Sequence, residues 1–209
     1  MHIKNVYLYV LDTMADWEYG YLTAELNTGR CFKKDITPLT VITAGADKEK
    51  ITTMGGVSVR PELSFDECSF GGDSLFILPG GETWGEEIHE PVLRKIGEAM
   101  EAGAVIAAIC GATVGLARMG YLDTKRHTSN DLEYLQMVCP DYKGEALYET
   151  KPAVTDGNII TASGIAPLEF AREVLKKLDV FTPDTLDAWY HLNKTHRPEY
   201  YYQLMKATS

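Results

Sequence analysis

The sequence predicts an α/β protein, a three-layer sandwich in which helices cover both faces of a doubly wound, mostly parallel sheet. Two observations support this prediction. Short apolar runs of strand length alternate with longer segments of helical period, and parallel strands need such helical connections between them. In addition, 45% of the 209 residues are hydrophobic, which is enough to form a sizeable core.

Each expected strand is a run rich in Val, Ile, Leu or Ala, and most are followed by an amphipathic segment. The expected strand and helix pairs are residues 6–11 with 16–27, 39–43 alone, 75–78 with 85–102, 105–109 with 111–119, and 159–162 with 167–178. Two smaller units complete the pattern. Residues 51–60, with two glycines at their centre, predict a hairpin, and residues 147–155 predict a further short strand pair.

No Pro-, Gly- or Ser-rich linker divides the chain, so we expect a single domain spanning residues 1–209. Its core is expected to extend over about residues 1–180, and residues 181–209 form a C-terminal helical extension. The aromatic residues of this extension, including Trp189, can pack on the parent domain, cover a cleft or join two subunits. Packing on the domain is the default expectation.

The charge of the chain argues against binding of nucleic acid and of anionic membranes. Twenty Lys and Arg against thirty Asp and Glu give a formal charge of −10, which repels phosphate groups. The longest basic clusters, at 125–126 and 176–177, are only two residues long. The first residues lack the pattern of a signal peptide and no apolar run is long enough to span a membrane, so we expect a cytoplasmic protein.

The four cysteines are scattered, without a CxxC motif or a cluster of Cys and His. This pattern suggests neither a disulfide framework nor a zinc site, and we expect no metal and no cofactor. The cysteines are Cys31, Cys68, Cys110 and Cys139.

Three loops follow expected strands and are predicted to meet at one edge of the sheet. They are residues 12–18, 79–84 and 110–112. In an open parallel sheet, ligands bind beyond the carboxyl ends of the strands, where such loops diverge. The sequence therefore predicts the functional site at this edge.

Cys110 stands at an expected strand-to-helix turn within the segment AVIAAICGATVGLA. Ala108 and Ala112 flank it at two-residue spacing, an arrangement related to the nucleophile elbow, which needs small neighbours. We expect the N-terminus of the following helix to lower the pKa of the thiol. The alternative is that Cys110 is only a buried core residue.

Glu18 shares a helical stripe with Leu22 and Leu26, which places it on the face toward the sheet. Burial there would raise the pKa of the carboxyl group, and a protonated carboxyl can donate a hydrogen bond to a thiolate. Equally, Glu18 can be a first-turn residue that interacts only with the helix dipole.

Backbone groups and one histidine complete the candidate site. Gly80 and Gly81 follow a strand and can present N–H groups to the cleft; with Gly111, the Gly81 N–H can form an oxyanion hole. His127 lies in a polar connection after the Cys110 helix, from which it can reach the sulfur as a base or thiolate partner. Most single loop histidines are merely solvated.

These residues together resemble the ThiJ/PfpI superfamily, which has the flavodoxin-like, class I glutamine amidotransferase-like fold. The resemblance rests on DWE with Glu18, LPGG with Gly80 and Gly81, AAICGA with Cys110, and ITASGIAPLEFA at 160–171. The superfamily includes intracellular proteases or amidases, glyoxalase- and deglycase-like proteins, chaperones and redox sensors, and most members are homodimers.

The resemblance implies a role for each site residue. Cys110 would be the nucleophile, Glu18 the acid that hydrogen-bonds to it, and Gly81 and Gly111 the oxyanion donors, with Gly80 beside them. His127 would be the nearby imidazole. Protease-like members carry a histidine directly after the cysteine, whereas this chain has Gly111, so peptidase activity is not expected.

We therefore expect a cysteine-dependent hydrolase or lyase, in which the Cys110 thiolate attacks a small amide or an oxoaldehyde-type carbonyl. The expected partners are a small-molecule substrate and a second copy of the chain. The alternative is a redox-sensing or thiol-binding protein in which Cys110 is oxidised and turnover is incidental. A third possibility is a domain that has kept the site without using it.

Overall fold

A computed structural model describes residues 2–208 of the chain. Its main sheet has seven strands in the order β5-β2-β1-β6-β7-β9-β8, and every neighbouring pair is parallel except β8 and β9. The strands of this sheet are β1 (Asn5–Tyr9), β2 (Val41–Gly45), β5 (Leu63–Ser64), β6 (Ser74–Leu78), β7 (Val105–Ile109), β8 (Ala153–Asp156) and β9 (Ile159–Ala162). A separate antiparallel hairpin consists of β3 (Ile51–Thr52) and β4 (Ser58–Val59), as predicted for residues 51–60.

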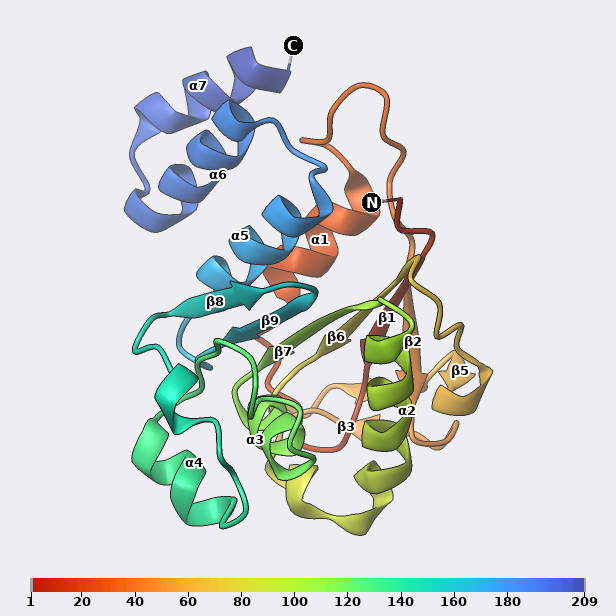
Figure 1. The fold of residues 1–209 in the computed structure, drawn as a ribbon. Coiled ribbons are helices and arrows are strands. Elements are labelled where there is room, and N and C mark those ends of the chain that lie inside the picture. The colour runs from red at the N-terminus through yellow and green to blue at the C-terminus, as the bar shows by residue number, and fades with distance from the viewer. Residues whose placement is uncertain (1, 209) are drawn as a thin grey trace.

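Helices lie on both faces of the sheet. Figure 1 shows α1 and α5 on one face and α2 and α3 on the other. The helices are α1 (Gly20–Thr28), α2 (Glu90–Glu101), α3 (Gly111–Arg118), α4 (Leu132–Val138), α5 (Pro167–Leu178), α6 (Pro183–Thr195) and α7 (Pro198–Thr208). The predicted three-layer sandwich with a mostly parallel sheet is confirmed.

Two helices begin later than the sequence pattern predicts. Helix α1 begins at Gly20 rather than at residue 16. The Asp16 carboxylate does not cap a helix, because it accepts hydrogen bonds from the β3–β4 hairpin. The donors are Thr53 Oγ1 (2.6 Å) and Gly55 N (2.7 Å). Helix α2 begins at Glu90, where a proline in its first turn fixes the start. Two 3-10 turns, η2 (Glu82–Gly85) and η3 (Glu87–His89), precede α2.

The segment 147–155 differs from the predicted strand pair. It supplies only the start of β8, which pairs with β9 at the edge of the main sheet, and a single bridge joins Tyr148 to His127. Helix α4 and the two-residue strand β5 were not predicted. Short elements of this kind carry too few residues to show a period.

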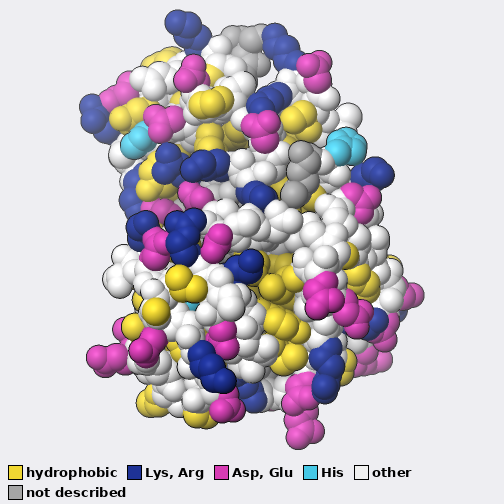
Figure 2. Space-filling model, in the orientation of Figure 1, with side chains coloured by type: hydrophobic (Ala, Val, Ile, Leu, Met, Phe, Trp, Pro, Cys, Tyr) yellow, Lys and Arg dark blue, Asp and Glu magenta, His cyan; other side chains and the backbone are white. Residues whose placement is uncertain are grey.

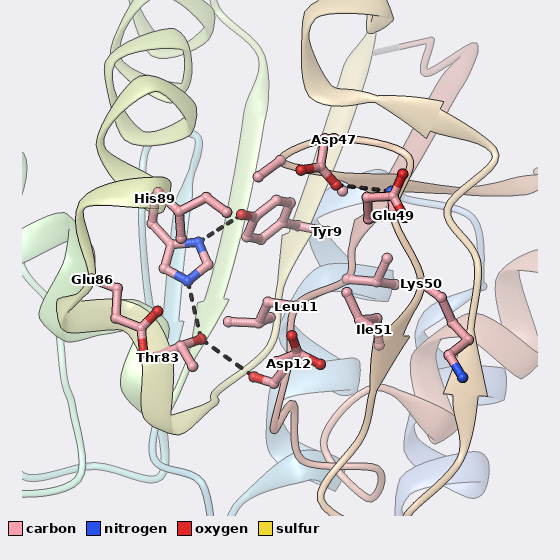
Figure 3. A pocket seen from close by; sticks show the side chains of 14 residues that line it. Tyr9, Leu11, Asp12, Asp47, Glu49, Lys50, Ile51, Thr83, Glu86 and His89 are labelled. Carbon is pink, nitrogen blue, oxygen red and sulfur yellow. Dashed lines mark hydrogen bonds between the residues drawn. The ribbon is translucent and has the colours of Figure 1, made fainter.

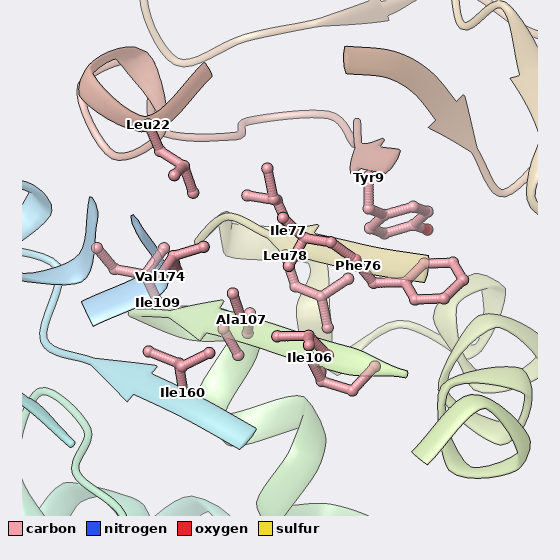
Figure 4. Packing of buried hydrophobic residues seen from close by; sticks show 14 of the residues in the cluster. Tyr9, Leu22, Phe76, Ile77, Leu78, Ile106, Ala107, Ile109, Ile160 and Val174 are labelled. Carbon is pink, nitrogen blue, oxygen red and sulfur yellow. The ribbon is translucent and has the colours of Figure 1, made fainter. Parts of the chain in front are cut away.

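The core lies between the sheet and its helices. Strands β6, β7 and β9 are buried on both faces, which explains why their sequences are continuous apolar runs. Figure 4 shows side chains of the sheet, such as Ile109 and Ile160, packing toward Val174 of α5 and Leu22 of α1. This rigid centre fixes the carboxyl ends of β1, β6 and β7, from which the site loops emerge.

The C-terminal extension packs on the face formed by α1 and α5. Trp189 of α6 is buried, and its Nε1 donates to the Glu25 carboxylate of α1 at 3.0 Å. The rings of Tyr21 and Phe181 contact the same indole edge-on. The C-terminal extension was expected to pack on the parent domain, cover a cleft or join two subunits. Helix α6 packs on the parent domain.

The surface carries both signs of charge. On the face seen in Figure 2, Lys and Arg side chains are interspersed with Asp and Glu. Across residues 2–208, no helix is both long enough and apolar enough to cross a membrane.

Candidate active site

Cys110 occupies a strained turn between β7 and α3. Its backbone has φ 58° and ψ −124°, in the positive-φ range that residues with a side chain rarely adopt. The Cys110 N–H donates to Ala162 O at 3.0 Å, and the Cys110 carbonyl accepts from Thr113 Oγ1 at 2.6 Å. These bonds hold the turn, and the geometry matches the predicted nucleophile elbow.

Two glycines let backbone approach the sulfur closely. A Cβ at Gly80 would lie 2.9 Å from Cys110 Sγ, and one at Gly164 would lie 2.7 Å from the same atom. Both distances are shorter than a real Cβ contact, so neither position accepts a side chain without displacement. Gly164 is held in place because its carbonyl accepts from Trp17 Nε1 at 3.1 Å. Gly164 was not among the residues predicted for the site.

Glu18 is buried beside the thiol, with 1% of its surface exposed. It lies in the turn before α1, on the same buried side as Leu22 and Leu26. Its Oε2 accepts from Gly80 N at 2.5 Å, while Oε1 has no conventional partner among the described residues.

The environment of Glu18 changes its acidity. Burial raises the pKa of the carboxyl group from 4.5 to about 7, against the opposing effect of hydrogen bonds from Gly80 and Cys110. The prediction that burial raises this pKa is confirmed. The carboxyl group is therefore present in both protonation states near neutral pH.

Burial also raises the pKa of the Cys110 thiol, and the charge of Glu18 raises it further. Hydrogen bonds from Asn130 and from the Gly111 N–H act in the opposite direction. The prediction of a lowered thiol pKa is wrong. The N–H at the start of α3 does not outweigh the loss of solvent and a neighbouring carboxylate.

Asn130 occupies the place beside the sulfur that the sequence analysis gave to His127. Its Nδ2 donates to Cys110 Sγ at 3.2 Å, and its Oδ1 accepts from Gly164 N at 2.8 Å. Asn130 thus ties the thiol to the loop that follows β9. Its only sequence signal was its position in the polar stretch 125–130.

His127 is buried away from this role. Its Nδ1 donates to Lys125 O at 2.6 Å, because a carbonyl can only accept, and its Nε2 then accepts from Tyr142 Oη at 2.5 Å. Burial lowers the pKa of the imidazole, which favours this neutral form. Since both nitrogens are engaged, the expectation that His127 serves as base or thiolate partner is corrected.

The glycine N–H groups divide into two kinds. The Gly80 N–H donates to the Glu18 carboxylate. The expectation that Gly80 is an oxyanion donor is therefore corrected. Gly81 N–H has no protein acceptor within residues 2–208. A Cβ at Gly111 would lie 3.3 Å from Gly81 N, which shows how closely the two backbones approach beside the sulfur.

A pocket of about 390 Å³ opens beside Asn130. It is lined by Thr128, Ser129, Asn130, Tyr148, Thr150, Lys151, Pro152, Ser163, Ile165, Ala166, Glu169 and Lys194. The described residues contain no group of three or more His, Cys, Asp or Glu arranged to hold a metal ion.

The other three cysteines differ from Cys110. Cys31, Cys68 and Cys139 are buried, whereas Cys110 is partly exposed. Burial raises the pKa of Cys31 to about 11 and that of Cys68 to about 12. Reagents from solvent should therefore reach Cys110 first.

Comparisons with known proteins agree with this fold. The model of the DJ-1/PfpI family matches residues 4–177. A Bacillus subtilis protein named "Uncharacterized protease YoaZ" is 64% identical over 207 residues, 99% of each chain. The crystal structure of a thiJ/pfpI family protein from Bacillus anthracis is 65% identical, covers 99% of this chain and 98% of its own, and has a TM-score of 0.98. The DJ-1 superfamily protein Atu0886 from Agrobacterium tumefaciens is 29% identical, with 93% and 100% covered and a TM-score of 0.80.

Proposed function

The chain belongs to the DJ-1/PfpI family, and on this premise we propose that it is a cysteine-dependent hydrolase or lyase of small carbonyl compounds. The substrate class is a small amide or an oxoaldehyde. One observation carries the proposal. A partly exposed thiol on a strained turn lies beside a buried carboxyl group whose pKa is raised to about 7, the range in which a group can both accept and donate a proton.

The first step would join Cys110 to the substrate. The sulfur forms a bond to the carbonyl carbon while the thiol proton passes to the ionised carboxylate of Glu18. The electron pair of the C=O bond moves to oxygen, where the N–H groups of Gly81 and Gly111 can stabilise it.

The remaining steps return the enzyme to its starting state. With an amide, Glu18 gives its proton to the departing amine as the C–N bond breaks, which leaves a thioester on Cys110. Water then attacks the thioester, the C–S bond breaks to release the carboxylic acid, and the proton that water loses goes back by way of Glu18 to the sulfur. Peptide hydrolysis is not part of the proposal, because His127 is engaged elsewhere and Gly111 follows the cysteine.

The test is turnover of methylglyoxal and of small acyl amides by the wild type and by Cys110→Ala. We expect activity in the wild type and none in Cys110→Ala. Cys139→Ala, a buried cysteine outside the site, is the matched control and should keep wild-type rates. Equal rates in the wild type and Cys110→Ala would contradict the proposal.

A redox role is the second candidate, favoured by the exposure of Cys110 relative to the other cysteines. In that role the thiolate attacks a peroxide oxygen, the O–O bond breaks, and a sulfenate and water or an alcohol result. Intact and peptide mass spectrometry after mild peroxide treatment should find oxygen first on Cys110. Earlier oxidation of Cys31, Cys68 or Cys139 would contradict this role.

The proposal includes a homodimeric, cytoplasmic protein. Support for the cytoplasmic part comes from the free state of the four cysteines. Support for the dimer comes from family membership alone. Sedimentation at micromolar concentration would give the oligomeric state directly, and a monomer would contradict that part.

A further inference from the structure

We propose that His89, together with Tyr9 and Thr83, forms a positioning relay that fixes the loop after β6 and so aims the Gly81 N–H at the substrate oxygen. The inference rests on the proposed function for its catalytic consequence. His89 itself lies in η3, outside the cluster around the sulfur, and no step described above uses it.

The relay is a chain of three hydrogen bonds with one possible direction. Thr83 Oγ1 donates its only proton to Asp12 O at 3.3 Å, so the same oxygen must accept from His89 Nε2 at 3.0 Å. His89 Nδ1 is then unprotonated and accepts from Tyr9 Oη at 2.7 Å. Figure 3 shows His89 between Tyr9 and Thr83, with a hydrogen bond to each.

Burial keeps both titratable members of the relay, His89 and Tyr9, in the required form. His89 is 3% exposed and Tyr9 is 1% exposed. Burial lowers the pKa of His89 to about 4, so the ring is neutral at physiological pH. Burial, together with the nearby Asp47 carboxylate, raises the pKa of Tyr9, which therefore remains a donor.

The relay reaches the site through a short, tightly held segment. Thr83 stands two residues after Gly81, and Thr13 Oγ1 accepts from the intervening Glu82 N at 2.8 Å. Without the imidazole, Thr83 Oγ1 loses its hydrogen bond from His89 in η3. The loop after β6 is then held by fewer hydrogen bonds.

Trp84 gives the relay a second connection to the site. Its ring centroid lies 5.2 Å from that of His89 and 5.5 Å from that of Tyr9. Its Nε1 donates to Pro79 O at 2.8 Å, and its Cδ1 lies 3.1 Å from where a Cβ of Gly111 would stand. A shift of the imidazole is thus passed by packing to both proposed oxyanion donors.

The experiment compares His89→Leu, which has neither donor nor acceptor, with His89→Gln. A glutamine amide has an acceptor oxygen and a donor NH2 group, so it supplies both functions of the neutral imidazole and can keep both bonds. Thr83→Val removes the next link and serves as a second disrupting variant if His89→Leu folds poorly. Three quantities are measured on each protein: exchange of the backbone N–H groups present within residues 79–84, kcat and KM for the carbonyl substrate, and the rate of Cys110 alkylation.

We expect exchange at residues 79–84 to rise about tenfold or more in His89→Leu and Thr83→Val, with β7 unchanged. In the same variants, kcat should fall about tenfold or more while KM and Cys110 alkylation stay near wild type, since alkylation develops no oxyanion. His89→Gln should restore both the protection and kcat.

Two results would overturn the relay: unchanged exchange in both disrupting variants, or a kcat that does not fall although the wild type is active. A wild type without turnover would instead remove the proposed function. Exchange at 79–84 would still decide whether the relay holds the loop.

Discussion

Two glutamates near α1 are both almost fully buried, yet their surroundings differ. Glu25 is 2% exposed, and its carboxylate accepts hydrogen bonds from the Arg30 guanidinium and from Trp189 Nε1. Glu18 is 1% exposed and receives one backbone N–H, and no Lys, Arg or His within residues 2–208 forms an ion pair with it. A buried carboxylate with a cation and an indole is anchored, whereas one without a cation must share or hold a proton.

The two glutamates contact different parts of the molecule. Glu25 joins α1 to the C-terminal extension, because Trp189 belongs to α6. Glu18 faces the sulfur of Cys110 with an oxygen that has no conventional partner, and burial raises the pKa of its carboxyl group to about 7. Of the two buried acids, Glu18 is therefore the one to which the proposed reaction assigns proton transfer.

Turnover gives the sharpest test of this comparison. In Glu18→Gln, kcat for the carbonyl substrate should fall by roughly 10²- to 10⁴-fold, because glutamine cannot accept the thiol proton. The matched variant Glu25→Gln should keep the wild-type kcat while unfolding at a lower denaturant concentration. An equal loss of activity in Glu18→Gln and Glu25→Gln would contradict the conclusion that only Glu18 takes part in the reaction.

The pH dependence of stability gives the next largest effect. The folded protein holds the Glu18 proton up to about pH 7 and the unfolded chain only up to about 4.5, so the folded state binds more protons between these values. The free energy of unfolding should therefore fall as pH rises through this window, by on the order of 3 kcal/mol. Urea unfolding at several pH values should show this decrease in the wild type and lose it in Glu18→Gln. A decrease of the same size in both proteins would assign it to another group.

Asn130 should have a smaller effect on the same thiol. Its amide donates to Cys110 Sγ and lowers the thiol pKa, so Asn130→Ala should raise the pKa and slow alkylation by iodoacetamide at pH 8 about severalfold. Asn193→Ala, whose amide donates to a backbone carbonyl of α6, is the control and should alkylate at the wild-type rate. Faster alkylation in Asn130→Ala would show that the amide does not stabilise the thiolate.

His127 should have the smallest effect on the site. His127→Leu removes two hydrogen bonds and leaves Tyr142 without its partner, so the free energy of unfolding should fall by about 1–3 kcal/mol. The rate of Cys110 alkylation should remain that of the wild type. A marked change in the alkylation rate would show that His127 acts on the Cys110 thiol and would contradict this prediction.

Much of the fold follows from the sequence because the central strands β6, β7 and β9 are buried on both faces. Runs such as the one before Cys110 have no polar interruption, and the helix at 167–178 was predicted with the bounds of α5. The convergence of Glu18, Gly80 and Cys110 also follows, since parallel strands place their carboxyl ends at one edge.

The missing parts depend on contacts between distant residues. Nothing local distinguishes Asn130 from His127 in their shared polar stretch; only the path of the chain after α3 brings one to the sulfur and turns the other toward Tyr142. The raised thiol pKa likewise reflects burial and the charge of Glu18, which helix position alone does not report. Gly164 is needed only because its loop passes against Cys110.

The most direct test of the coupled Glu18 and Cys110 pair is the pH dependence of Cys110 alkylation by iodoacetamide. Rates would be measured in the wild type and in Glu18→Gln, with the modified peptide identified by mass spectrometry. The thiol of Glu18→Gln should titrate at lower pH, because the charge and the hydrogen bond that raise its pKa are gone. Superimposable profiles in the two proteins would show that Glu18 does not act on the sulfur and would contradict the account.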